Sequence, residues 1–511
     1  MDQAEEIKQL KAQLKAANEK SAQLTAIIKL QQNQMFGKKT EVIEKVAAGQ
    51  QSLFSDDELA NLQDQQVTIT EVIEETKQRV VRHRKPKATG RRTSFLNHLP
   101  QVNRVIEVED TSCPQCHQEM TKIGQRLYSR EPQLKPAELY CLNYYQESYA
   151  CHSCDHGDHD VVVSSTMPQS LLPHSYFSSS ILAKVAELKF HLALPFHRQI
   201  KLWQTIGLPV TARQLATNII SACQSYLDPL YQKLLTLMKA EAVIHMDETP
   251  FKVIEEAKEQ SYFWVIRSTK EFSQHQMAIF NYYNNRSGKT ISQMVGQDYD
   301  GIIMCDGYGG YSNRLYPQTK FGSCLVHIRR EFYRITKLLK EEQLRPSHAV
   351  KVLALMRSIF HQEKLLKYRT PEEKCQQRQL VIRPLMDRLY EYLEQIRLPQ
   401  RLLKRAVNNA LRLKKRVYRI FENGQVPLTN NPVEQAIRPS TLIRKNSLFA
   451  TSIAGAQANA VYYSLVATAK LNQLDVYKYL KYLFDHLPNR KGEDLEAYLP
   501  WSKTVQENCH K

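Results

Sequence analysis

Three acidic residues in the C-terminal half of the chain stand where carboxylates can do chemistry. Asp247 ends the apolar run 242–246, Asp306 ends a second apolar run, 301–305, and Glu434 lies in the polar segment 429–439. Burying an unpaired charge costs several kcal/mol, so an apolar strand that finishes on a carboxylate is better explained by a divalent cation at its end. Two such strands and a helix-borne Glu predict an oxygen cage for two Mg²⁺ ions, or Mn²⁺ in their place, that promotes phosphoryl transfer.

Each carboxylate has an expected part in that cage: Asp247 bridges both ions, Asp306 holds one, and Glu434 completes the other. Three cations near Glu434 are expected to hold phosphates beside the scissile bond, namely Arg438, Arg444 and Lys445. Taken singly, however, each aspartate is better explained as the cap of a turn after a strand. Four rival carboxylates lie nearby, so the pattern alone does not select the three: Glu248, Asp298, Asp300 and Glu422.

The bulk composition bounds the class of protein. A chain of 511 residues is too long for one hydrophobic core, so several domains are expected. The 70 Lys and Arg against 52 Asp and Glu give a net charge of +18, which favours a polyanion such as nucleic acid over a charge that serves solubility alone. No apolar run approaches the ~18 residues that span a bilayer, and ten cysteines in this length do not predict a disulfide scaffold. We therefore expect a cytoplasmic protein without membrane association.

The N-terminal segments suggest oligomerisation and DNA contact. Residues 1–50 contain a seven-residue apolar repeat over 5–36, which predicts a coiled coil, most simply in a homodimer, although one helix packed on its own domain gives the same pattern. Residues 51–105 form a charged linker whose basic arm is expected to follow a DNA backbone or lie in a minor groove; a merely solvated linker is the alternative. The cations of this arm are Arg82, Arg84, Lys85, Lys87, Arg91 and Arg92.

Residues 106–165 predict a zinc-binding module. Two C-x-x-C knuckles supply four thiolates, Cys113, Cys116, Cys151 and Cys154, the set that closes a structural tetrahedral Zn²⁺ site. Free thiols are the alternative. Nearby side chains that could replace one ligand are His117, Cys141, His152 and His156. Four protein ligands leave no open position, so the ion is expected to stabilise the fold rather than to catalyse.

Residues 170–235 predict a helical DNA-binding region of the helix-turn-helix kind. A helix is expected over Arg198–Thr205, a break at 207–209, and a second helix capped by Thr211 that carries Arg213 near its start. Any helical hairpin would give the same signal, so DNA contact by Arg213 is one of two interpretations.

The catalytic core is expected to be a ribonuclease-H-like sheet interrupted by helices. Within 240–327, strands are predicted at 242–246, 262–266 and 276–282, then a helix at 289–295 and a strand at 301–305. In that order the first and fourth strands are neighbours, which brings Asp247 beside Asp306. An all-helical insertion (328–425) then separates these aspartates from the last part of the core (426–490), which holds the helix of Glu434; 491–511 is a C-terminal tail. The predicted fold class is therefore multidomain α/β.

Several sequence blocks resemble one family of bacterial transposases. The blocks are Met246–Pro250, Cys305–Tyr311, Cys324–Phe332, Asn430–Pro439, Arg444–Phe449 and Tyr463–Asn472. They are similar to the large D-D-E transposase of insertion-sequence family sixty-six, whose members also carry an N-terminal coiled coil and a C-x-x-C zinc module. The resemblance implies Asp247, Asp306 and Glu434 as the catalytic triad, with supporting roles for Cys324, His327 and Asn431. It also implies binding to the terminal inverted repeats of an element and to target DNA, strand cleavage and transfer, a nucleoid-associated protein, and help from small accessory proteins.

The chain departs from the family pattern at three positions. Leu325 and Ser447 stand where the family usually has Trp, and Thr429 stands where it usually has Asp. None of these changes removes a catalytic carboxylate, but Thr429 removes one acceptor beside the Asn pair. Two alternatives to a transposase remain at this point: an inactive domesticated DNA-binding regulator, and a structure-specific nuclease that cuts without joining.

Overall fold

The computed structural model describes residues 137–511, apart from 152–160, 174, 259, 345–346, 398–400, 491 and 493, and isolated positions between 97 and 132. The predicted coiled coil, the basic arm and the zinc ligands Cys113, Cys116 and Cys154 lie outside the described residues, as does the side chain of Cys151. The chain divides into two compact units. The elements below belong to the larger unit, whose described residues lie within 145–205 and 209–511.

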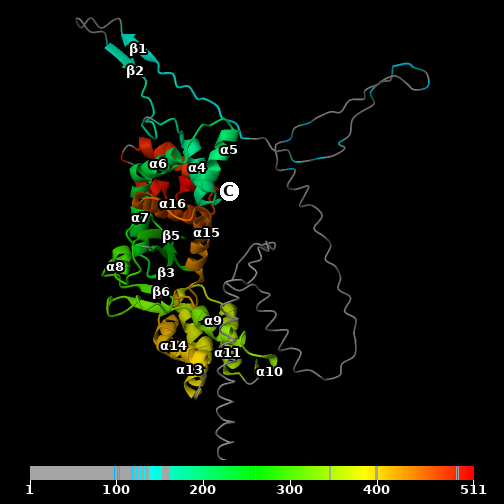
Figure 1. The fold of residues 1–511 in the computed structure, drawn as a ribbon, viewed down its shortest axis with the longest axis vertical. Helices are drawn as coiled ribbons and strands as arrows, with labels where there is room; N and C mark the ends of the chain where they lie inside the picture. The colour runs from blue at the N-terminus through cyan, green and yellow to red at the C-terminus, as the bar shows by residue number, and fades with distance from the viewer. Residues whose placement is uncertain are drawn as a thin grey trace, which may run out of the picture. The chain divides into compact units, whose positions relative to one another are not determined.

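A five-stranded mixed sheet forms the centre of the larger unit (Figure 1). Its strands are β3 (Val243–Phe251), β4 (Ser261–Ser268), β5 (Ala278–Tyr283), β6 (Ile302–Cys305) and β7 (Lys320–Ser323), in the order β5-β4-β3-β6-β7. β3, β4 and β5 pair antiparallel, whereas β3, β6 and β7 pair parallel. The prediction that the first and fourth strands of this region are neighbours is therefore confirmed, and α8 (Thr290–Val295) forms where a helix was expected.

Two details of the sheet differ from the sequence-based expectation. β3 does not end at Asp247 but continues to Phe251, because its antiparallel ladder with β4 runs on from Asp247↔Val265 to Phe251↔Ser261. The strand β7 was not anticipated, since Lys-Phe-Gly-Ser carries little β-propensity. A Cβ at Gly322 would stand 2.8 Å from Sδ of Met304 on the neighbouring strand, so a larger residue there would require the Met304 side chain to shift.

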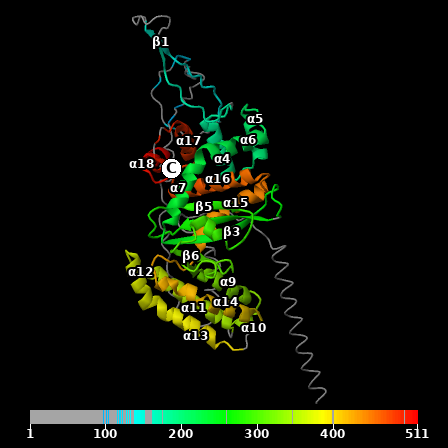
Figure 2. The ribbon, with the colours of Figure 1, turned by 90° about the vertical axis from the view of Figure 1, so that its left-hand side faces the viewer.

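Helices α15 (Asn431–Ser447) and α16 (Ile453–Leu471) pack against the sheet (Figure 2). α15 packs on β3 and β4, and α16 packs on the edge strand β5. Two hydroxyls of α16 accept hydrogen bonds from the backbone of β5: Ser464 from Phe280 N at 2.8 Å, and Thr468 from Ala278 N at 3.2 Å. These bonds satisfy the open edge of the sheet, which would otherwise offer unpaired backbone groups to another strand.

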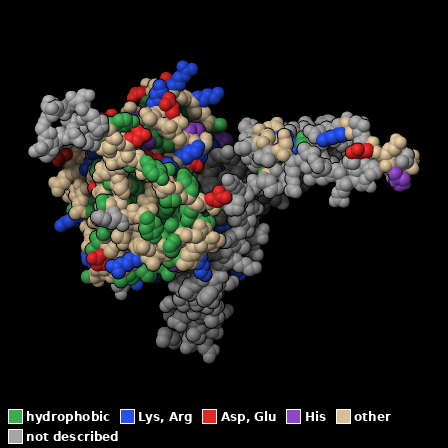
Figure 3. Space-filling view, turned by 90° about the horizontal axis from the view of Figure 1, so that it is seen from above, with side chains coloured by type: hydrophobic (Ala, Val, Ile, Leu, Met, Phe, Trp, Pro, Cys, Tyr) green, Lys and Arg blue, Asp and Glu red, His purple; other side chains and the backbone are tan. Residues whose placement is uncertain are grey.

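The N-terminal helices match the predicted helical pair. α4 (Ser179–Phe190), α5 (Phe196–Thr205), α6 (Ala212–Ala222) and α7 (Asp228–Lys239) follow one another, with a π-helical turn at Cys223–Leu227. Thr211 caps α6 in a complete capping box with Gln214, so the predicted cap is confirmed. In Figure 3, Lys and Arg side chains share the visible surface with hydrophobic ones. Before α4 a short hairpin joins β1 (Ser148–Cys151) to β2 (Val161–Ser164).

Residues 325–421 are helical, as the sequence predicts. The helices are α9 (Leu325–Thr336), α10 (Glu341–Leu344), α11 (His348–Leu365), α12 (Pro371–Gln377), α13 (Arg383–Gln395) and α14 (Arg401–Val417). In both ribbon views they lie on the β6–β7 side of the sheet, away from α16 (Figures 1 and 2). α9 and α14 pack on each other, and α14 also packs on β7.

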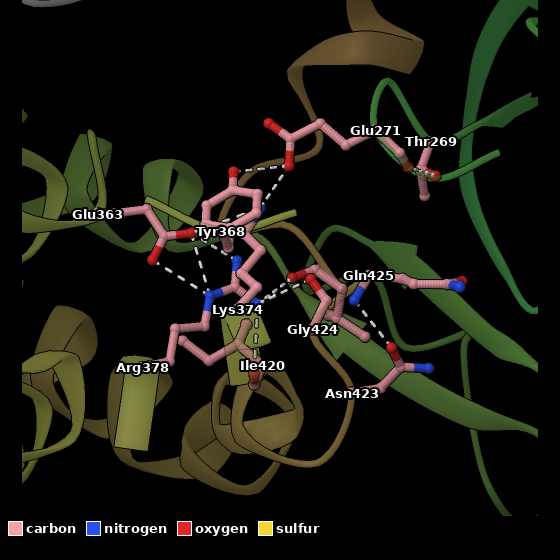
Figure 4. A network of polar contacts seen from close by, with 11 residues as sticks. Thr269, Glu271, Glu363, Tyr368, Lys374, Arg378, Ile420, Asn423, Gly424 and Gln425 are labelled. Atoms are coloured by element: carbon pink, nitrogen blue, oxygen red, sulfur yellow. Dashed lines mark hydrogen bonds and ion pairs between the residues drawn. The ribbon is translucent and has the colours of Figure 1, made fainter. Parts of the chain in front are cut away.

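A buried arginine joins this helical region to the segment that leads back to the sheet (Figure 4). Arg378 is fully buried and forms an ion pair with Glu363 at 2.5 Å. Its guanidinium also donates to the carbonyls of Ile420, Gly424 and Val426, at 3.2, 3.3 and 2.8 Å. Backbone carbonyls in a buried turn need donors, and one planar guanidinium supplies them all, so Arg378 fixes the path of the chain ahead of α15.

The C-terminal residues are folded rather than extended. α17 (Val476–His486), a 3₁₀ turn at Leu495–Tyr498 and α18 (Lys503–Cys509) pack together, and α17 also packs on α4. Apolar side chains of residues 491–511 are buried, among them Tyr498, Leu499 and Val505. Among the described residues, no helix has both the length and the hydropathy to span a bilayer.

We expect the substitution Arg378→Met to lower Tm by about 5 °C or more, because it leaves Glu363 and the three carbonyls without their partner. Thermal unfolding followed by circular dichroism measures this. The matched control is Arg388→Met, at an exposed position on the neighbouring α13, which should shift Tm by no more than about 1 °C. Equal Tm values for the two variants would show that the buried network does not stabilise this region.

Candidate active site

Two of the three predicted carboxylates meet at the junction of β3 and β6. The parallel register pairs His245 with Met304, and the same register carried two residues further places Asp247 beside Asp306, which follows the last residue of β6. Burial raises the pKa of Asp247 well above its usual range, and the nearby charges of Glu248, Asp306 and Glu434 raise the pKa further. Asp306 and Glu434 are therefore both close enough to Asp247 to disfavour its charged form.

Each aspartate also uses one oxygen to order the backbone. Oδ1 of Asp306 accepts from Tyr308 N at 2.8 Å, and Oδ1 of Asp247 accepts from Glu248 N at 2.9 Å. The turn-cap interpretation therefore holds for Asp306, and it is compatible with a metal-binding role because the second carboxylate oxygen stays available for a ligand. After Asp306, Gly309 faces open space, whereas Gly307 lies against α14 and its carbonyl accepts from Arg412 at 3.3 Å.

The position of Glu434 depends on Asn430, the residue just ahead of α15. The side chain of Asn430 is fully buried and donates to the carbonyl of Met246 at 3.0 Å, while its Oδ1 lies 2.9 Å from Nδ1 of His245. Its backbone N–H donates to Sγ of Cys324 at 3.1 Å. One asparagine thus joins β3, the start of α9 and the start of α15. Pro432 is the second residue of α15, and Glu434 falls in the first turn, where the helix dipole favours a negative charge.

α9 brings two cations or potential cations to Glu434. Nε2 of His327 lies 3.4 Å from Oε1 of Glu434, and Nη2 of Arg330 lies 3.8 Å from Oε2. Burial lowers the pKa of His327, against the opposing effect of Glu434, so the neutral imidazole is favoured near pH 7. His327 of the C-x-x-H block therefore lies beside Glu434, and its supporting role stays a prediction.

Cys324 has a structural part in this arrangement. It stands at the N-cap of α9, is buried, and accepts the hydrogen bond from Asn430. Burial raises the pKa of its thiol to about 11, so the group stays protonated at neutral pH. The hydrogen bond from Asn430 connects Cys324 to the start of α15.

The donor set at the site fits a hard divalent cation. Oε1 of Glu434 and Oδ1 of Asn431 are both buried and have no hydrogen-bond partner among the described residues. Buried acceptors without donors are costly unless a ligand satisfies them, and carboxylate and amide oxygens are the ligands that Mg²⁺ and Mn²⁺ prefer. Within the part of the chain that the structure describes, no three His, Cys, Asp or Glu side chains stand in ready-made ligand geometry, so the carboxylates converge without forming a closed cage.

The four rival carboxylates either bind other partners or lie away from the predicted triad. Glu248 is directed to other partners: Arg286 at 2.5 Å and the hydroxyl of Tyr311 at 2.9 Å. Burial raises the pKa of Glu248, and the ion pair with Arg286 opposes that rise. The other rivals lie elsewhere: Asp298 and Asp300 are exposed before β6, and Glu422 pairs with Arg419 in the helical region.

The cations predicted to bind phosphate or DNA differ in their contacts and in their exposure to solvent. Arg444 donates to Oγ1 of Thr249 at 3.0 Å and to the carbonyl of Pro250, so it anchors α15 to β3. Arg438 and Lys445 are exposed, and Arg438 lies one turn after Glu434. Arg213 is exposed in the first turn of α6.

Sequence reasoning missed three residues of this site: His245, Asn430 and Arg330. His245 was hidden inside an apolar run, and Asn430 gave only the signal of an Asn pair before a Pro. Arg330 stands one helical turn after His327, a spacing that places both on one helix face. This spacing was the sequence signal that could have identified Arg330 as a residue of the site.

Comparison with known families puts the chain among the transposases. Residues 174–458, more than half of the chain, match the family model described as Transposase IS66 family. The chain belongs to this family. Three further models match other segments: the IS66 C-terminal element at 464–501, the zinc-finger binding domain of transposase IS66 at 110–155, and "Transposase C of IS166 homeodomain" at 23–104.

Curated relatives span nearly the same length. The uncharacterized protein y4jD of Sinorhizobium fredii is 24% identical over 487 residues, which cover 91% of each chain. The uncharacterized protein y4qI of the same organism is 24% identical over 523 residues, covering 98% of this chain and 92% of the relative. The resemblance inferred from the sequence blocks is confirmed, and the protein is a transposase of an insertion element with a zinc-finger region.

We expect Asp247→Asn to raise Tm by about 2–4 °C at pH 7 without divalent cations, because it removes a buried charge beside other carboxylates. The pKa of Asp247 is raised in the folded state, so the folded protein binds the proton more tightly than the unfolded chain does. Wild-type stability therefore falls as pH rises from the ordinary carboxyl range through the raised pKa, and the advantage of the variant should grow over the same interval.

Thermal unfolding with and without Mg²⁺ checks this expectation. Mg²⁺ should raise the Tm of the wild type more than that of Asp247→Asn, because the ion replaces the missing counter-charge. Asp300→Asn, at an exposed position before β6, is the control and should respond as the wild type does. A less stable Asp247→Asn protein at every pH, with no effect of Mg²⁺ on the wild type, would contradict the assignment.

Proposed function

We propose that this chain is a D-D-E transposase that cleaves the ends of its insertion element and joins them to target DNA in a metal-dependent reaction. The observation that carries the proposal is the convergence of Asp247, Asp306 and Glu434 from three segments distant in the chain. The antiparallel trio β3–β5, with β6 and β7 added parallel to β3, supports a ribonuclease-H-like core interrupted by the helical region 325–421.

Asp247, Asp306 and Glu434 would hold two divalent cations, with Asn431 as a further oxygen donor. The ions would lower the pKa of the attacking water or 3′-hydroxyl and stabilise the leaving oxygen of an in-line displacement. The protein's own residues fix the geometry. Asn430 holds the start of α15 against β3, and Arg444 anchors α15 at the other end.

Glu434 must change partners for this reaction. In the structure it lies near His327 and Arg330. When Glu434 turns to a cation, Arg330 becomes available for a phosphate oxygen, and His327 stays within reach of the same region. Both side chains come from α9, so substrate binding and the assembly of the acidic site would be coupled through one helix.

The DNA partner is supported by exposed cations around the site and on the N-terminal helices. Arg438 and Lys445 on α15 would grip phosphates beside the scissile bond. Arg213 on α6 and the basic arm at 82–92 would bind the inverted repeats and target duplex. Pairing of two chains through residues 1–50 would bring two element ends together, small proteins of the same element would assist, and the complex would act at the bacterial nucleoid in the cytoplasm.

A strand-transfer assay with labelled element ends and Mg²⁺ tests the proposal. Asp247→Asn, Asp306→Asn and Glu434→Gln should each reduce joining by about a thousandfold or more, because losing one ligand removes several kcal/mol of transition-state stabilisation. Binding of the ends in a mobility-shift assay should stay within a few-fold of wild type. Asp300→Asn is the matched control and should join DNA normally.

The product pattern separates the alternatives. Cut ends without joined products would indicate a structure-specific nuclease. End binding without any cleavage in Mg²⁺ or Mn²⁺ would indicate a DNA-binding regulator. Full joining activity of Asp247→Asn would remove the triad assignment.

The zinc-finger region should hold one Zn²⁺ per chain through Cys113, Cys116, Cys151 and Cys154. Atomic emission on the purified protein measures the metal content. Replacing Cys113 and Cys116 together by Ser should remove the ion, whereas Cys141→Ser should leave it bound. A full zinc content in the double variant would move the site to other ligands.

A further inference from the structure

A cavity of about 140 Å³ lies behind the proposed catalytic helix. Its walls are formed by α15, α16 and the strands β4 and β5, with Phe190 of α4 completing them. The aromatic side chains are Phe190, Phe280 and Tyr463, all buried. The space corresponds to about ten water molecules, since one water occupies ~10–15 Å³ on this measure. It therefore admits a small organic molecule.

One wall of this cavity carries a buried cation. Arg267 is 7% exposed and lines the cavity. Within the described part of the chain, its guanidinium has neither a hydrogen bond nor an ion pair. Burial lowers its pKa to about 10, and no carboxylate opposes that effect. The facing groups are also not acidic: His245 lies directly across the β3–β4 ladder, and Lys470 lines the same cavity.

An uncompensated guanidinium of this kind is costly. Burying an unpaired charge destabilises the folded state by several kcal/mol. Arg378 shows what the fold does where a buried arginine is structural, since that side chain pairs with Glu363 and three carbonyls. Arg267 has no comparable partners, so a ligand is the simplest source of its missing counter-charge.

We propose that this cavity binds a small aromatic anion, with its carboxylate or phosphate on Arg267 and Lys470 and its ring among Phe190, Phe280 and Tyr463. A guanidinium binds such groups through two parallel hydrogen bonds. Aromatic walls favour a flat apolar body over a hydrated inorganic ion. The ring and the acidic group can belong to a free aromatic acid or to a nucleotide, which share this chemistry.

Occupancy of the cavity would affect the helix of Glu434. Pro432, Gln435 and Pro439 of α15 line the cavity, while Glu434 lies at His327 and Arg330 on α9. A bound anion would therefore brace α15 from behind. Binding itself does not require the three carboxylates, so it is separable from the proposed catalytic activity.

The test uses the full-length protein and four probes: benzoate, thymidine 5′-monophosphate, inorganic phosphate and benzyl alcohol. At about 100-fold excess over Kd, an aromatic anion should raise Tm by about 3 °C. Inorganic phosphate and benzyl alcohol, which each lack half of the required chemistry, should raise it much less. A response to benzoate alone indicates a free aromatic acid, and a stronger response to the nucleotide indicates a base with its phosphate. No shift with either aromatic anion would overturn the proposal.

Two variants assign the response to this cavity. Arg267→Met should abolish the shift, weaken binding at least tenfold in calorimetry, and raise Tm of the ligand-free protein, because an unpaired buried charge has been removed. Lys470→Met should weaken binding by a smaller factor, and it keeps the test open where Arg267→Met does not fold. Arg198→Met, at an exposed position on α5, and Asp247→Asn should both bind like wild type.

Hydrogen exchange gives a second readout. The aromatic anion should slow exchange of the amides of α15 in the wild type and not in Arg267→Met. Equal binding by the wild type and both cavity variants would place the ligand elsewhere and contradict the assignment.

Discussion

The buried amide of Asn430 is the interaction on which the site depends. It bonds the backbone of Met246, the imidazole of His245 and, through its own N–H, the thiol of Cys324. Three elements that carry or flank the acidic residues are thereby held at one point. An apolar residue at this position would leave a carbonyl and an imidazole nitrogen without partners in the interior, so the asparagine is required by hydrogen bonding as well as by shape.

The free-energy cost of burying charge explains many of the other contacts at the site. Asp247 is buried beside Glu248, Asp306 and Glu434; burial is the main cause of its raised pKa, and the neighbouring charges raise the pKa further. The structure relieves part of the repulsion by pairing Glu248 with Arg286 and by bringing His327 and Arg330 to Glu434. The divalent cations proposed above would neutralise the rest. Arg267 behind α15 presents the opposite case, a buried positive charge without a counter-charge. Buried charges without a full counter-charge among the described residues thus lie on both sides of α15.

Hydrogen bonds within the helical region between Asp306 and Glu434 fix the path of the chain before it returns to the sheet. Arg378 binds the carbonyls of residues 420, 424 and 426, and this fixes the approach to Asn430. The region also contributes to the site, because His327 and Arg330 lie on its first helix. An insertion of this size therefore positions the last carboxylate as well as separating it in sequence.

The sequence by itself determined the elements and the family. Apolar runs and turn residues predicted β3 to β6, the capping residue Thr211 predicted the start of α6, and the specific blocks from 246 to 472 predicted the transposase family. Each of these signals lies within a short segment, so it can be recognised in a single sequence. Tertiary structure alone decided that β3 continues past Asp247, that β7 joins the sheet, that Arg444 anchors a helix, and that Asn430 and Arg330 serve the site. Each of these depends on a partner distant in the chain, and hydrogen bonding and charge pairing across such distances leave no periodic trace in the sequence.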